Sequence, residues 1–278
     1  MLKKIHYSLL AIILFCHLGY SQKEKLIGNK IVKTEQRELP DFHTIEINDN
    51  FPVVLEEGSS NIAVVEADGN FLEFIKTEVV DEVLTISAMN DFKRYKALEI
   101  RLYCASELRK IVINDEAVLK SLTPIKASDL HIESRSNEKM FLTVEAGTVQ
   151  TYLHQKSDLK LHSKVGDAYF KINENASLEG IVTGDSLTVD LYQKGKIKLE
   201  GAVQYAFIHT NEDTDFEASK LPIKIAKVSA KGNSECNIFC QDSLDLTARD
   251  KSKIYLYGTP AIKITEFSDE TILYKKTN

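Results

Sequence analysis

The side chains of this chain that are best suited to bind a ligand are four tyrosines and a histidine in its C-terminal half. An aromatic ring can stack on a sugar ring or on an apolar patch of a partner, and an imidazole can exchange hydrogen bonds with it. The local alternation of apolar and polar residues places these side chains at outward or corner positions. We therefore expect a binding surface at Tyr152, Tyr169, Tyr192, Tyr255 and His209, with Phe207 as a further outward ring. The alternative is that such rings pair across strands and stabilise a sheet.

The charged residues near these rings do not indicate a catalytic or metal centre. One outward column mixes acid, aromatic and base, and it consists of Glu133, Tyr152, Lys171, Asp190 and His209. Its carboxylates are separated along the column, which favours ion pairing on a solvated face over the paired carboxylates of a glycosidase. The histidines fall at different offsets of the repeat, and the sequence has no phosphate-binding loop, nucleophile elbow or His-Glu-x-x-His motif. We expect no catalytic residue, no metal and no cofactor.

The cysteines do not predict a disulfide framework. Apart from Cys16 near the N-terminus, the chain has Cys104, Cys236 and Cys240, which is an odd number. Cys236 belongs to an apolar inward column, and this favours a buried thiol. In one extended strand, Cys236 and Cys240 would lie about 13 Å apart, too far for a disulfide unless a corner falls between them.

The elements that must position these residues are short strands in a repeat of just under twenty residues. A first column recurs at steps of 18 to 21 residues, at Ile111, Ile132, Thr151, Phe170, Val189, Ile208, Val228, Leu246 and Ile264. Eight residues after each lies a second column, at Leu119, Met140, Leu159, Leu178, Ile197, Phe216, Cys236, Ile254 and Ile272. Two residues before the first column lies a third, at Leu130, Val149, Ala168, Leu187, Ala206, Ala226, Leu244 and Ile262. Apolar residues alternate with polar ones within each unit, which is typical of strands.

A repeat of this length predicts a solenoid. The units are shorter than the roughly thirty residues of a βαβ crossover, so successive strands must pair by coiling around an axis. Polar turns such as Glu174-Asn175 separate the first and second columns. The predicted fold is all-β, a right-handed single-stranded parallel β-helix of about nine coils, each one strand spacing of roughly 4.8 Å from the next.

The rest of the chain divides into three further segments. Residues 1–21 combine Lys3-Lys4 with an apolar run at 9–15, which predicts a secretory signal peptide cleaved after Ser21. The alternative is a lipoprotein signal that uses Cys16, although Phe15 occupies the position where a small residue is expected. Residues 22–41 are expected to form a charged lead-in arm, and residues 42–105 a β-rich N-terminal cap. The parallel β-helix would occupy residues 106–278.

The cap segment alternates without the repeat. Strands are expected at Ile45–Ile47, Phe51–Leu55, Ile62–Val64 and Leu98–Leu102, with turns such as Glu57-Gly58-Ser59 between them. Asn70 could be the N-cap of a short helix, although a strand is also compatible with that stretch. Such a cap would cover the first coil and keep the solenoid soluble.

Two blocks of the sequence resemble a known exported family. They are Phe42-His-Thr-Ile-Glu-Ile-Asn-Asp-Asn-Phe-Pro-Val-Val-Leu-Glu-Glu-Gly58 and Val79-Val-Asp-Glu-Val-Leu-Thr-Ile86, followed by the strand-turn repeats. The cadence of apolar residues is similar to that of the family called putative auto-transporter adhesin, head GIN domain. The resemblance implies an exported envelope protein with a parallel β-helix and an adhesive role, and it carries over no catalytic residue. This chain has Asn114-Asp115-Glu116 where the family often has a Gly-rich turn, which predicts a looser or longer turn.

Composition narrows the classes of function. The net charge is -6 and there is no basic patch, which argues against a nucleic-acid partner. The leading hypothesis is a non-enzymatic protein of the periplasm, outer-membrane surface or extracellular space that binds a glycan or an envelope protein. The alternatives are a carbohydrate-active lyase or hydrolase on the same scaffold, and a structural or assembly component of the envelope. No transmembrane segment is expected in the mature chain, and the sequence leaves its oligomeric state open.

Overall fold

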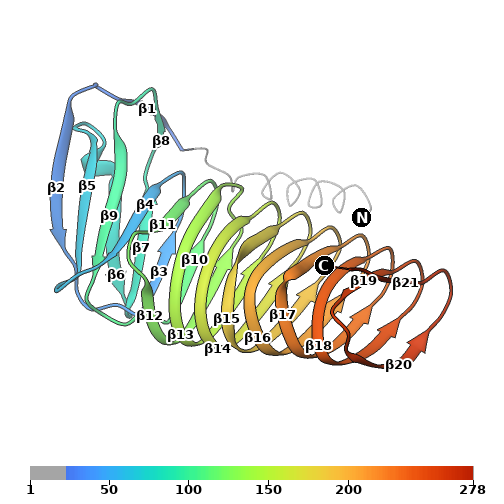
Figure 1. The fold of residues 1–278 in the computed structure, drawn as a ribbon. Coiled ribbons are helices and arrows are strands. Elements are labelled where there is room, and N and C mark those ends of the chain that lie inside the picture. Colours follow the sequence, from blue (N-terminus) through green and yellow to red (C-terminus); the bar gives the residue numbers. More distant parts are fainter. Residues whose placement is uncertain (1–22, 278) are drawn as a thin grey trace, which may run out of the picture.

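The computed structural model describes residues 23–277, which form an N-terminal cap and a long rod of stacked coils (Figure 1). The predicted signal peptide and Cys16 lie outside the described residues. The cap contains β1 (Lys25–Ile27), β2 (Val32–Glu38), β3 (Thr44–Ile47), β4 (Pro52–Glu57), β5 (Ile62–Asp68), η1 (Leu72–Phe74), β6 (Ile75–Val80), β7 (Val83–Ala88), β8 (Asp91–Lys93) and β9 (Leu98–Cys104).

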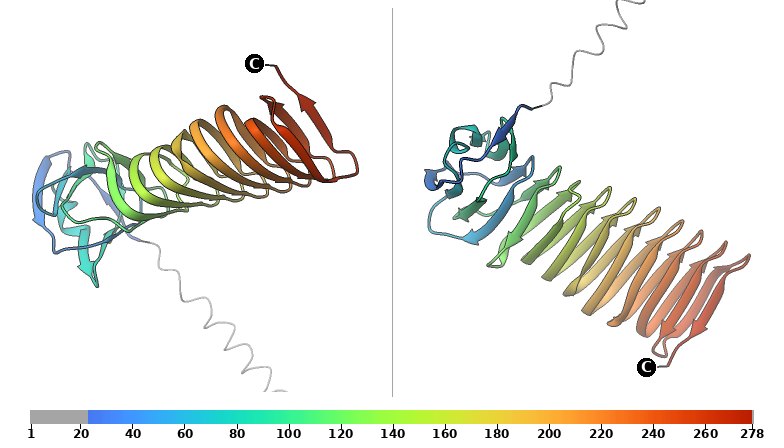
Figure 2. Two further views of the ribbon diagram at one scale, coloured as in Figure 1. Left: turned by 60° about the horizontal axis from the view of Figure 1, so that its bottom comes forward. Right: turned by 90° about the horizontal axis from the view of Figure 1, so that it is seen from above.

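The rod consists of strands that each pair in parallel with the strand of the next coil. They are β10 (Lys110–Ile113), β11 (Val118–Ser121), β12 (Ile125–Ser134), β13 (Lys139–Leu153), β14 (Asp158–Ile172), β15 (Ser177–Leu191), β16 (Lys196–Thr210), β17 (Asp215–Ala230), β18 (Glu235–Ala248), β19 (Lys253–Tyr257), β20 (Ala261–Phe267) and β21 (Ile272–Lys275). The predicted all-β fold is confirmed as a parallel β-solenoid of about nine turns. Figure 2 shows the stacked coils from two further directions.

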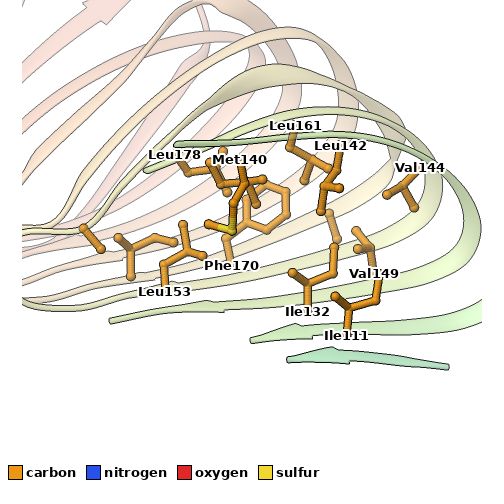
Figure 3. Close-up of a cluster of buried hydrophobic side chains, with 14 of the residues drawn as sticks. Ile111, Ile132, Met140, Leu142, Val144, Val149, Leu153, Leu161, Phe170 and Leu178 are labelled. Atoms are coloured by element: carbon orange, nitrogen blue, oxygen red, sulfur yellow. The ribbon is translucent and has the colours of Figure 1, made fainter. Parts of the chain in front are cut away.

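The strand register confirms the first column. Phe170 pairs with Val189, and Val189 pairs with Ile208, so these side chains lie directly over one another. All three are at most 2% exposed. The same register continues to Leu246 and Ile264 at the end of the rod. In Figure 3, Met140, Leu142 and Leu161 face Ile132, Val149 and Leu153 across the interior, with Phe170 between them.

The second column is confirmed except at the last coil. Ile254 pairs with Leu273, whereas Ile272 lies opposite Lys253 and is 41% exposed. The cause is a bulge after Leu246, which leaves Thr265 without a register partner. The extra residue moves the inward position from Ile272 to Leu273.

Each middle coil is one long strand that bends without interrupting its pairing. In β13, Met140, Leu142 and Val144 face inward before the bend, and Val149 and Leu153 face inward after it. The backbones approach closely at the bend, since a Cβ on Gly147 would lie 2.7 Å from the carbonyl oxygen of Ser128. Glycine is therefore required there.

The turns between the two faces share one conformation, except the turn at Ser136, which has no residue of positive φ. Glu174 and Gln193 have φ of 61°, and Gly232 has φ of 70° at the corresponding position. The predicted looser or longer turn at Asn114–Glu116 is wrong. Asp115 has φ of 57°, and Asn114 Nδ2 donates a hydrogen bond of 2.8 Å to Asn48 Oδ1 of the preceding coil.

The stacking of coils continues from the rod into the cap. Ile45 in β3 pairs with Ile111, and Val53 in β4 pairs with Leu119. On the other side of this coil, β7 pairs with β3 and β9 pairs with β4, again in parallel. Residues of the expected lead-in arm form β1, which pairs with β8, and β2, which pairs with β5. The divisions at residues 41/42 and 105/106 stay predictions, and the hydrogen bonding crosses both.

Antiparallel strands close the N-terminal end. β6 pairs with β7, and β5 pairs with both β9 and β2. Leu84 and Ile100, whose column positions would otherwise be open, are fully buried. The interpretation of Asn70 as an N-cap is wrong, because η1 has no side-chain cap and Asn70 Nδ2 donates to the carbonyl oxygen of Ile27 at 2.9 Å.

Asp68 at the end of β5 joins three segments of the cap. One carboxylate oxygen accepts a hydrogen bond from the Lys30 backbone N–H at 2.7 Å, and the other accepts from Lys96 at 2.8 Å and Ala97 at 3.1 Å. The side chain is fully buried. Burial alone would raise the pKa of Asp68, but these backbone donors, with the charge of Lys30, hold it below its ordinary value.

The cysteines of the described residues are free and buried, as the sequence predicts for Cys236. Burial raises the pKa of both Cys104 and Cys236 to about 12. The thiolate is the reactive form of cysteine, so these thiols are inert packing groups at neutral pH.

Replacing Thr151 with Val is expected to stabilise the rod by about 1 kcal/mol. Thr151 is the polar member of the first column, and its hydroxyl is buried without a hydrogen-bond partner in residues 23–277. Valine has the same shape and removes that unsatisfied group. The matched control is Ser157→Ala. The Ser157 hydroxyl donates to the carbonyl oxygen of Ser134 at 3.0 Å, so its removal should destabilise the rod. Melting temperatures of both variants check the prediction, and a lower value for Thr151→Val would contradict it.

Candidate functional site

A continuous row of polar and aromatic side chains crosses five consecutive coils on the outer face of the rod. The rings of His131 and Tyr152 stack with centroids 4.7 Å apart, and those of Tyr152 and Tyr169 lie 5.6 Å apart. The Tyr169 hydroxyl donates a hydrogen bond of 2.6 Å to Asp190 Oδ2. On the next coil, His209 Nδ1 lies 3.8 Å from Asp190 Oδ1. Each member of the row thus contacts the next.

The strand register explains why the row is continuous. The residues one position before and one position after each first-column residue point outward, and they form two parallel columns. The row takes its members from both of these columns. Tyr169 lies between Gln150 and Thr188 in one column, while Tyr152 and Asp190 flank Lys171 in the other. Because Gln150 and Thr188 carry no ring, Tyr169 has room to tilt toward both Tyr152 and Asp190.

Two members of the row, His131 and Tyr169, have shifted pKa values. Burial, and then the charge of Lys110, lower the pKa of His131, so its imidazole is neutral. Burial and the hydrogen bond to Asp190 raise the pKa of Tyr169, so its hydroxyl remains a donor. An ionised carboxylate has more acceptor sites than one tyrosine uses, so Asp190 can accept a further hydrogen bond from a ligand.

Exposed apolar side chains extend the row along β16. Tyr205, Phe207 and His209 alternate with buried residues on that strand, and Tyr205 pairs in register with Ile225. Tyr205 is 48% exposed, Phe207 51% and Ile225 45%. We define the aromatic strip as the surface made by His131, Tyr152, Tyr169, Asp190, Tyr205, Phe207, His209 and Ile225. Sequence reasoning missed His131, Tyr205 and Ile225 as site residues, although counting outward positions back from Ile208 would have found Tyr205.

The remaining two predicted site residues lie in different places: Tyr192 is next to the strip, two residues after Asp190, and Tyr255 is apart from it. Tyr192 lies in the turn after β15 and is half-buried, and its pKa is raised by burial and then by Asp190. Tyr255 lies on β19, among the outward positions of the second column. Its ring stacks on Tyr274 at 4.9 Å, with the Lys276 ammonium 4.9 Å from its centroid. Tyr255 therefore belongs to a different surface.

Charged residues on the outer face pair with one another, as the sequence predicts. Glu179 Oε2 lies 3.5 Å from Lys160 Nζ, and Glu179 Oε1 lies 3.6 Å from Lys198 Nζ. Lys160 and then Lys198 lower the pKa of this carboxylate. Across residues 23–277, no three His, Cys, Asp or Glu side chains come together in a group that could hold a metal ion.

Comparison with known proteins identifies the family. The family described as putative auto-transporter adhesin, head GIN domain, matches residues 41–181 and 167–260. The two matched segments together span well over half of the chain. The chain belongs to that family. Its head GIN domain therefore includes the cap from β3 onward and the rod as far as β19.

Solved structures of other proteins show a similar fold. A putative adhesin from Parabacteroides distasonis ATCC 8503 has a TM-score of 0.64 at 18% identity, over 91% of this chain and 100% of its own. A putative adhesin from Parabacteroides merdae ATCC 43184 has a TM-score of 0.61 at 18% identity, over 91% and 99%. A putative lipid binding protein from Parabacteroides distasonis has a TM-score of 0.60 at 17% identity, over 91% and 100%. Among curated proteins, none matches this sequence.

Proposed function

We propose that this head GIN domain protein is a non-enzymatic, exported protein of the cell envelope that binds an extended glycan along its aromatic strip. The observation that supports the proposal is the unbroken row from His131 to His209. Five coils at roughly 4.8 Å per coil give the row a length of roughly 20 Å. A row of that length suits several consecutive rings of a linear sugar chain.

The chemistry of the strip fits a sugar. The apolar faces of pyranose rings stack on tyrosine and phenylalanine, and sugar hydroxyls exchange hydrogen bonds with imidazole and carboxylate groups. Tyr152, Tyr169 and Phe207 provide the rings, and Asp190 and His209 provide polar partners beside them. Contacts within the row hold Tyr169 in place before a ligand arrives, which lowers the entropic cost of binding.

The family description supports an adhesive role, and two of the structural relatives carry the name putative adhesin. Within residues 23–277, no helix is long and apolar enough to cross a membrane. We infer that the mature protein acts in the periplasm, at the outer-membrane surface or outside the cell. Fractionation of cells, with external protease applied to intact cells, tests this placement.

Replacing Tyr169 with Ala is expected to weaken glycan binding about tenfold or more, because it removes a stacking ring and the hydrogen bond to Asp190. A glycan array identifies a ligand, and calorimetry then compares Tyr169→Ala with wild type. Tyr255→Ala is the matched control, since it removes an outward tyrosine from the other surface. Tyr169→Phe separates the ring from the hydroxyl, and we expect it to retain most of the affinity.

The same samples distinguish the other functions. Equal affinities for wild type and Tyr169→Ala would show that the strip is not the binding site. A blank array with capture of one envelope protein would favour a protein partner. A blank array with binding to phospholipid vesicles would favour the activity named for the lipid binding relative. The appearance of new reducing ends or unsaturated sugars would establish an enzyme.

A further inference from the structure

The C-terminal end of the rod exposes its interior. β20 pairs with β18, and β21 pairs with β19, and no other segment of residues 23–277 pairs with either strand. Ile262 is 44% exposed, Ile264 51% and Phe267 42%, although their partners in β18 are fully buried. Figure 2 shows this end, in red, with no other described part of the chain beyond it.

The two ends of the rod are therefore different. At the N-terminal end, the antiparallel strands β5 and β6 cover the coil that β7 and β9 form, and Leu84 and Ile100 of that coil are fully buried. An open end cannot stack on a covered end without displacing the cap. This geometry excludes a filament in which the C-terminal end of one copy stacks on the N-terminal end of the next. The C-terminal end of one copy can still pair with the C-terminal end of another.

We propose that two copies of this protein associate through their C-terminal ends, with β20 of one copy antiparallel to β20 of the other. A two-fold axis across the rod places the exposed isoleucines of one end against those of the other and gives each β20 edge a hydrogen-bonding partner. Because the same patch is used by both copies, the assembly closes at two. The occupant is a second copy of this chain, and the interface is separate from the aromatic strip.

The sequence of β20 is complementary to itself in this arrangement. The bulge at Thr265 shifts the alternation, so that Ile262, Ile264 and Phe267 face inward while Lys263 and Glu266 face outward. The antiparallel register that keeps inward residues on one face pairs Ile262 of one copy with Phe267 of the other. The same register pairs Lys263 of one copy with Glu266 of the other, which have opposite charges.

β21 opposes association rather than favouring it. Lys275 pairs in register with Leu256, so a lysine occupies the inward column at the edge of this strand. An inward-facing charge on an edge strand hinders pairing with another chain. The interface is therefore centred on β20, and Lys275 limits its strength.

Sedimentation equilibrium of the purified protein, from about 1 μM to about 1 mM, tests the proposal. We expect the mean mass to rise with concentration from one chain to two and no further. Ile262→Lys should weaken association about tenfold or more, because it places two like charges against the apolar end. The matched control is Ile181→Lys, an isoleucine that is also 44% exposed but lies on the side of the rod, and it should dimerise like wild type.

Four further variants test the geometry of the interface. Lys275→Leu should strengthen association about fivefold or more, since it removes the opposing charge. Lys263→Glu and Glu266→Lys should each weaken association, and the double variant should recover it. A protein that stays monomeric up to the highest concentration would overturn the proposal. So would growth beyond two chains, or an Ile262→Lys variant that dimerises like wild type. Circular dichroism confirms that each variant is folded.

Discussion

Replacing Leu159 with Asp is expected to prevent the rod from folding. Leu159 is fully buried in the second column, stacked between Met140 and Leu178. The change removes a buried leucine, which costs about 2 to 5 kcal/mol, and places an unpaired carboxylate where no cation can reach it. The combined loss is comparable with the total stability of a typical domain, about 5 to 15 kcal/mol.

His162→Asp is the matched control, because it places the same side chain at an exposed position three residues away on β14. Its neighbours in register, Thr143 and Ile181, are uncharged, so we expect little change. Circular dichroism and the soluble yield of each variant give the measurement. If Leu159→Asp kept a cooperative thermal transition near that of wild type, the inward position of this column would be disproved.

Replacing Asp68 with Ala is expected to destabilise the cap by about 3 kcal/mol or more. The carboxylate accepts hydrogen bonds from three backbone N–H groups, of Lys30, Lys96 and Ala97. Each buried donor left without a partner costs about 1 to 3 kcal/mol. The site can relax and admit water, which is why the lower part of the summed range is expected. Hydrogen exchange should show faster opening of β2 and β5.

Asp68 should also make the stability of the cap depend on pH in the acid range. The pKa of Asp68 is lower in the folded chain than in the unfolded chain. Its contribution is therefore present above the unfolded pKa of about 3.9 and is lost as the pH falls through the folded value. Wild type should lose more stability than Asp68→Ala between about pH 5 and the acid limit.

Glu66→Ala provides the control for both measurements. It removes an exposed carboxylate from the same strand, and we expect it to leave the stability of the cap nearly unchanged. Equal denaturation midpoints for Asp68→Ala and Glu66→Ala would show that the three hydrogen bonds do not hold the cap together.

The rod could be predicted from the sequence because its information is local and repeated. Nearly every coil places Ile, Leu, Val or Phe at the same offset, and a slip of one residue would turn the whole column outward. The prediction is wrong at Ile272 because nothing in the local pattern marks Thr265 as a bulge. The pairing of β7 and β9 with β3 and β4 was also beyond the pattern, since those strands lie outside the repeat and find their partners through tertiary contacts.

The candidate site was predictable in part. Alternation alone places Tyr152, Tyr169 and His209 outward, and the structure confirms that they share one face. The alternation does not determine that Tyr169 leans toward Asp190, because that orientation depends on which neighbouring side chains leave space. Alternation also places Tyr255 outward, but it does not show that the first and second columns lie on different faces of the rod.

The parallel stacking of coils has a mechanical consequence. The backbone hydrogen bonds run along the rod, whereas the chain itself runs across it. A pull on the C-terminal segment therefore loads the hydrogen bonds of one coil at a time, and the coils should separate one after another from β21 toward the cap. A load applied sideways through the strip is shared by many bonds at once. A tether that enters at the cap, where antiparallel strands lock the end, would let such a rod withstand shear flow far better than a tether at the opposite end.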